Sequence, residues 1–199
     1  MTPSLSRMSR AVGVKFFVEK DSHVPLSVFI PIFHRWIQED KLEGLLIDVA
    51  QYTHLHQGPG VLLIAHEANY SFDETLGHRG LLYTQKRPPV KGGLDHLKTA
   101  FRRALLASDL LEKEPELAGK MTFATNHFQV FVNDRLAAPY NADSQEDLEN
   151  VLKTLFDSLY EGASTVLMPD MNRQNRTGFE VHVDKTFGRD ELLKRLNAN

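Results

Sequence analysis

The chain has 199 residues, of which 42% are hydrophobic and 25% charged, so one core can bury roughly 70% of the unfolded surface. The net charge of −3 argues against a dedicated nucleic-acid-binding protein. The lack of cysteine excludes disulfides and thiolate zinc sites. No segment approaches the ~20 apolar residues of a transmembrane helix and residues 1–11 lack a signal-peptide core, so we expect a cytoplasmic protein without membrane contact and with a disordered 1–11 segment.

The first half of the chain alternates strand and helix patterns. Residues 12–19 predict a strand, and an apolar stripe within residues 25–40 predicts a helix with Trp36 in the core. Pro31 suits only a first helical turn, so we expect the helix to begin near Ile30. Further strands are expected at 45–49, 61–65 and 80–84, and residues 61–73 are either one bent strand or two.

The second half carries two long amphipathic patterns. Residues 94–112 predict a helix, residues 121–133 a strand, and residues 164–168 and 178–183 two more strands before a short helix at 189–196. A second long helix is expected to start with Ser144 as its N-cap and to bury a leucine-rich stripe that includes Leu152.

These elements predict an α+β fold in which helices pack on one face of a mainly antiparallel sheet. Residues 12–199 are expected to form one domain, with possible halves at 12–90 and 120–199 that both run strand, helix, strand, strand. An internal duplication and a coincidence of common units both explain this order. The wholly apolar run 61–65 predicts a central strand covered on both faces, and a second subunit could supply the outer cover.

A cluster of histidines is the leading candidate site. Residues 45–85 hold four of the nine histidines, including the His54-x-His56 pair. Two imidazoles from one loop, with His66 as a third nitrogen, can hold a divalent metal such as zinc in an open catalytic site. Asp48 interrupts an apolar strand and could act beside a histidine as a general base. The predicted catalytic residues are therefore His54, His56, His66 and Asp48, and the predicted metal ligands are the three histidines; the alternative is that these are ordinary loop and core histidines.

A second candidate is an anion site at the start of the 94–112 helix. Lys91, Gly92 and Gly93 precede this helix, where free backbone N–H groups and the helix dipole favour an anion, and Arg102 could reinforce the charge. The segment does not have the spacing of a phosphate-binding P-loop, and a solvated basic helix face is the alternative.

The sequence contains no GxSxG, GxGxxG or EF-hand motif. The prediction is a ligand-binding or oligomeric non-catalytic protein, with a homodimer as the expected assembly and a small anionic ligand as a possible partner. Two alternatives stay open. One is a metal-assisted or histidine-based, hydrolase-like enzyme with its site at 48–78, and the other is an anion- or nucleic-acid-binding protein that uses residues 86–103.

Overall fold

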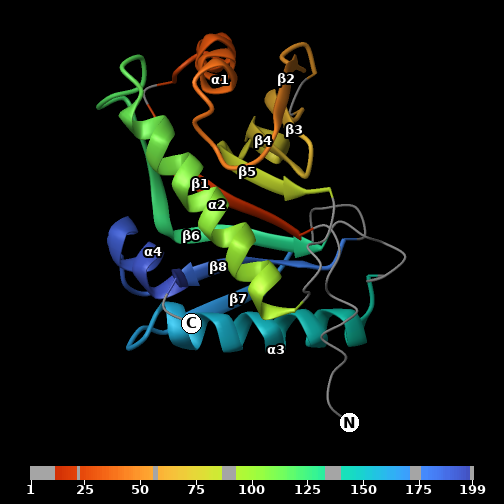
Figure 1. Ribbon diagram of the computed structural model, residues 1–199. Helices are drawn as coiled ribbons and strands as arrows, with labels where there is room; N and C mark the ends of the chain where they lie inside the picture. Colours follow the sequence, from red (N-terminus) through yellow and green to blue (C-terminus); the bar gives the residue numbers. More distant parts are fainter. Residues whose placement is uncertain are drawn as a thin grey trace.

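One eight-stranded antiparallel sheet organises the structure (Figure 1), a computed structural model that describes residues 12–21, 23–55, 58–86, 93–132, 140–170 and 176–197. Within these residues the strand order is β2-β3-β4-β5-β1-β6-β8-β7. The strands are β1 (Val12–Asp21), β2 (Leu46–Gln51), β3 (Val61–Ala65), β4 (Ala68–Asp73), β5 (Gly80–Gln85), β6 (Met121–Val132), β7 (Thr165–Pro169) and β8 (Gly178–Val183).

The helices lie together on one face of this sheet, as predicted (Figure 1). They are α1 (Phe29–Gln38), α2 (Leu94–Lys113), α3 (Ala142–Leu159) and α4 (Arg189–Asn197), with short 3-10 turns η2 (Leu26–Val28) and η3 (Thr75–Gly77). Aromatic contacts join both long helices to the sheet: Phe101 of α2 meets Phe16 edge-on at 6.1 Å, and Phe156 of α3 meets Phe128 at 5.5 Å. The α+β class with helices on one face is therefore confirmed.

Strand alternation gives the sheet a second, polar face. Val14 and Phe16 of β1 enter the core under the helices, so Lys15 and Phe17 point to the other side. The register continues this face through β6 and β8, because Lys15 pairs with Gln129 and Gln129 pairs with Glu180. We call this side the open face; its central residues are Lys15, Phe17, His127, Gln129, Glu180 and His182.

The two predicted halves share one sheet through the pairing of β1 with β6. The duplication hypothesis aligned β1 with β6 and β3 with β8. In the sheet, β8 pairs directly with β6, whereas β5 and β4 separate β1 from β3. The strand order therefore does not show an internal duplication, and the element order alone does not distinguish it from common supersecondary structure.

The structure tests three local predictions made from the sequence. Residues 61–73 form two strands, β3 and β4. Trp36 is fully buried, as predicted, and its indole nitrogen donates to the carboxylate of Glu114 at 2.5 Å. The N-cap prediction is wrong: Asn141 caps α3, and its side chain accepts from the backbone N–H of Ser144 at 2.9 Å.

The predicted central position of residues 61–65 is also wrong. β3 lies second from the sheet edge, and its residues 62 and 64 are only half-buried on the open face. The predicted disorder of residues 1–11 falls outside the described residues. Within the described part of the chain, no helix combines the length and apolarity needed to cross a membrane.

Candidate metal centre

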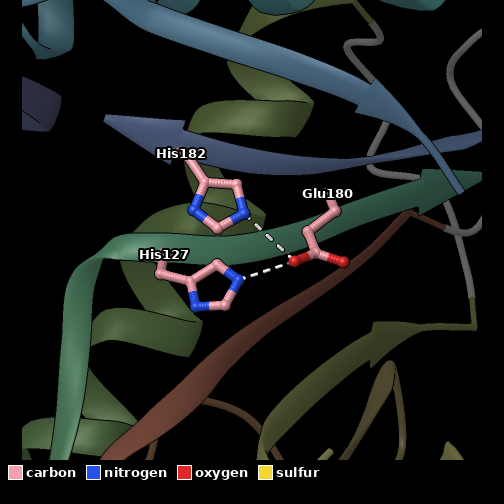
Figure 2. Close-up of side chains that lie close together, drawn as sticks. All are labelled: His127, Glu180 and His182. Carbon is pink, nitrogen blue, oxygen red and sulfur yellow. Dashed lines mark hydrogen bonds and ion pairs between the residues drawn. The ribbon is translucent and has the colours of Figure 1, made fainter. Parts of the chain in front are cut away.

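Three potential metal ligands converge on the open face (Figure 2). The donor atoms of His127, Glu180 and His182 all lie within 4.8 Å of one another, and this is the one such group of three among the described residues. Oε1 of Glu180 lies 2.7 Å from Nε2 of His127 and 3.1 Å from Nε2 of His182. One carboxylate oxygen is thus shared by two imidazoles.

The pairing of β6 with β8 creates this convergence. His127 is the register partner of His182, and cross-strand partners in an antiparallel sheet stand side by side on one face. Their rings stack with centroids 4.0 Å apart. Glu180 precedes His182 by two residues and so projects from the same face. The intervening Val181 is fully buried on the helix side, which fixes the orientation of β8.

Electrostatics favours an ionised carboxylate beside a neutral imidazole. Burial lowers the pKa of His127, and the hydrogen bond to Glu180 only partly offsets this effect. Burial disfavours the charged form of Glu180, but hydrogen bonds from His127 and His182 outweigh burial and lower the pKa of Glu180. Metal binding requires deprotonated ligands, so the charge states of His127 and Glu180 near neutral pH suit a cation.

The ligand atoms lie somewhat closer together than they would around a bound ion. Zinc bonds of about 2.0–2.2 Å in a tetrahedral site place neighbouring ligand atoms about 3.3–3.6 Å apart. The two His–Glu separations of 2.7 and 3.1 Å would therefore widen by roughly 0.2–0.9 Å on metal binding. A coordinated ion lies near the plane of each imidazole, and the two rings are only 23° from parallel, so at least one ring must tilt toward the other. Three protein ligands would leave a coordination position open for water or substrate.

A buried ion pair lies next to the cluster on the open face. Lys15 and Asp73 have side-chain exposures of 0% and 3%, and the Nζ–Oδ1 distance is 2.5 Å. Lys15 also donates to the backbone carbonyl of His78. The ring of Phe17 lies 5.6 Å from that of His78 and 4.5 Å from that of His127, so it bridges the ion pair and the cluster.

A small cavity opens beside Glu180. Its volume of about 20 Å³ is enough for one water molecule. Gln129 donates through Nε2 to Asp170 at 2.5 Å, while its buried Oε1 has no hydrogen-bond donor among the described residues. A water molecule in the cavity could donate to this oxygen. The lining residues are Phe17, Thr75, Leu76, His78, Gln129, Asp170 and Glu180.

The residues predicted at 48–66 lie elsewhere. Asp48 is exposed on the edge strand β2, where its carboxylate accepts the backbone N–H of Val49 at 2.7 Å. His54 follows β2, whereas His66 lies in the turn between β3 and β4 and donates its backbone N–H to the carbonyl of Leu45.

Because β2 and β3 are antiparallel, His54 and His66 lie beyond opposite ends of β3, whose five residues span about 14 Å. The structure therefore does not bring together Asp48, His54 and His66 as a ligand group. His56 lies outside the described residues, so metal binding by the His54–His56 pair stays a prediction.

The predicted anion site is only partly described. Gly93 precedes α2 with a φ of 83°, and Lys91 and Gly92 fall outside the described residues. Arg102 makes two hydrogen bonds of 2.7 Å each to the carboxylate of Glu43. This pairing engages the guanidinium with a protein carboxylate, and anion binding at the helix start stays a prediction.

The sequence held a signal for the residues that were missed. In residues 178–183 the apolar side chains alternate with Glu180 and His182, and in residues 127–130 they alternate with His127 and Gln129. This alternation places a histidine and a second polar group on one face of each strand. It does not reveal that the two strands are neighbours.

Comparisons with known proteins add no assignment: no family model, no curated protein and no solved structure matches this chain. Functional inference therefore depends on the geometry of the open face.

Proposed function

We propose that this protein binds a divalent transition metal ion, with zinc as the leading candidate, through His127, Glu180 and His182, and that the site supports metal-assisted chemistry of the hydrolytic type. The observation that carries the proposal is the convergence of two imidazoles and one carboxylate from paired strands on a face that no described helix covers.

The donor set fits this chemistry. Imidazole and carboxylate ligands suit zinc, and two histidines with one glutamate are a known catalytic ligand set with an open fourth position. A zinc ion there would lower the pKa of a bound water to about 7 and polarise a carbonyl oxygen. The cavity beside Glu180 has room for one water molecule next to the proposed ligands.

A second candidate is histidine-based acid–base chemistry without a metal. The near-parallel rings of His127 and His182, hydrogen-bonded to one carboxylate oxygen, favour it. A carboxylate that orients an imidazole in this way is a common general-base arrangement. Metal titration separates the two candidates, because the second requires no ion.

The test is calorimetric titration of metal-free protein with zinc. We expect one ion per chain, with affinity reduced by about 100-fold or more in His127→Ala and in His182→Ala, because each variant removes a direct ligand. Two matched variants, His34→Ala and His66→Ala, remove exposed histidines away from the cluster and should bind like the wild type.

His54→Ala completes the set. If this variant abolishes binding while His182→Ala preserves it, the loop histidines are the ligands instead. If the wild type binds no zinc at micromolar concentration, the metal proposal fails and the acid–base candidate stands.

Three further expectations are carried as proposals of their own: a cytoplasmic location, self-association as a dimer, and binding of a small anion near Gly93. Cell fractionation, light scattering of the purified protein and phosphate titration test them in turn.

A further inference from the structure

Two exposed apolar side chains flank the proposed metal centre. Val166 and Met168 of β7 are 54% and 41% exposed. Val166 is the register partner of His182, and Met168 is the register partner of Glu180. Cross-strand partners share a face, so these side chains stand on the open face directly beside two of the ligands. We call Val166 and Met168 the β7 shelf.

The carboxyl groups near the proposed metal ligands restrict which polar head group a bound molecule can have. Asp170 and Glu180 both line the small cavity next to the centre, so two carboxyl groups already face the space beside the proposed metal ligands. A carboxylate on the bound molecule would lie close to these two carboxyl groups, and their repulsion would offset part of its attraction to the metal ion. A neutral carbonyl group avoids this repulsion and is a group that a zinc ion polarises well.

We propose that the ligand of this site is a small neutral acyl compound, such as an amide or ester, whose carbonyl oxygen meets the metal and whose apolar tail lies on the β7 shelf. The inference rests on the proposed metal function and adds the substrate class to it. Ligand sites commonly combine a few placed polar groups with an apolar wall, and the β7 shelf supplies such a wall beside the polar cluster.

The opposite edge of the sheet offers a matched control. Leu45, the residue just before β2, and Ile47, within β2, are 67% and 53% exposed and so resemble the shelf residues in exposure and chemistry. β2 and β7 are the two edge strands of the sheet, with six strands between them. Substituting Leu45 and Ile47 therefore changes exposed apolar area without touching the centre.

The experiment compares acetohydroxamic and hexanohydroxamic acid on zinc-loaded protein by calorimetry. The two probes share one chelating acyl head and differ by four methylene groups. Full burial of one methylene gives about a fourfold gain in affinity, so half-burial of four predicts roughly 15-fold tighter binding of the longer probe. The Val166→Ser/Met168→Ser variant should reduce this ratio to about twofold, and the Leu45→Ser/Ile47→Ser variant should keep it.

Each outcome decides something. Equal affinities of the two probes for the wild type, or a full chain-length effect in the shelf variant, overturn the shelf. Stronger competition by hexanoate than by hexanamide overturns the neutral head group. Zinc binding without any chain-length effect refutes only this inference, whereas a protein that binds no zinc refutes the metal function and the inference with it.

Discussion

The buried pair of Lys15 and Asp73 gives the sharpest test of the structure. The ammonium group is fully enclosed, and Asp73 is its carboxylate partner at 2.5 Å. Lys15→Met keeps most of the side-chain volume but removes the charge and the hydrogen bond to the carbonyl of His78. The buried carboxylate of Asp73 then loses its ion pair with Lys15.

The expected cost follows from the burial of both partners. Removing one member of a buried ion pair typically costs about 3–5 kcal/mol. Asp73 keeps other hydrogen bonds, among them those from the hydroxyl of Thr75 at 2.6 Å and from the backbone N–H of Thr75 at 3.3 Å. These bonds partly stabilise the stranded carboxylate, so we expect a loss near the lower end, about 3 kcal/mol. The Lys15→Met/Asp73→Leu variant should lose clearly less than the sum of the two single changes.

Urea unfolding at pH 7 measures these free energies. An unchanged slope of the free energy of unfolding against urea concentration would show that the variants unfold to the same state. The control is Lys41→Met, which breaks an exposed pair with Glu39 whose side chains are 43% and 48% accessible. That change should stay within about 0.5 kcal/mol of the wild type. A loss below about 1 kcal/mol for Lys15→Met, or strictly additive single changes, would show that the pair is not buried as described.

The remaining predictions concern the core, a helix cap and pH. Leu152→Ala should cost about 2–5 kcal/mol in urea unfolding because Leu152 is fully buried, and a loss under about 1 kcal/mol would contradict this packing. Asn141→Ala should cost about 1 kcal/mol and Ser144→Ala almost nothing, since the Asn141 side chain is the cap; equal losses would contradict this assignment. Burial lowers the pKa of His96, so the unfolded state takes up this proton first and the free energy of unfolding falls as the pH drops below about 6.5. The His96→Leu variant should therefore lose less stability than the wild type between pH 7 and 5. An unchanged dependence of the melting temperature on pH in this variant would refute the prediction.

Local patterns predicted the elements well because each pattern reports one strand or helix at a time. The stripe around Leu152 and the alternation in residues 178–183 are set by burial of one side of each element. The prediction of the N-cap of α3 was wrong for a local reason. Asn141 and Ser144 are both good capping residues three positions apart, and the extended backbone of Asn141, with φ −150° and ψ 172°, decides the start.

The site could not be predicted in the same way because it depends on contacts between distant strands. Glu180 and Gln129 are register partners although 51 positions separate them in the chain. Nothing in either segment specifies its neighbour in the sheet. The histidines at 54 and 66 show the opposite error: nearness in sequence suggested a cluster, but the antiparallel course of β2 and β3 separates them.

The open face combines features that packing alone does not explain. Lys15, Asp73 and Gln129 are almost fully buried there, although the helices cover the other side of the sheet. Buried polar groups destabilise a fold unless they are satisfied, and apolar residues of similar size would often serve stability as well or better. Nζ of Lys15 lies 5.6 Å from the ring centroid of Phe17, which in turn lies 4.5 Å from that of His127. Gln129 is the register partner of Glu180. If the proposed metal function is correct, these contacts would help to hold His127 and Glu180 in place as ligands, and loss of zinc affinity in a Gln129→Ala variant would support that role.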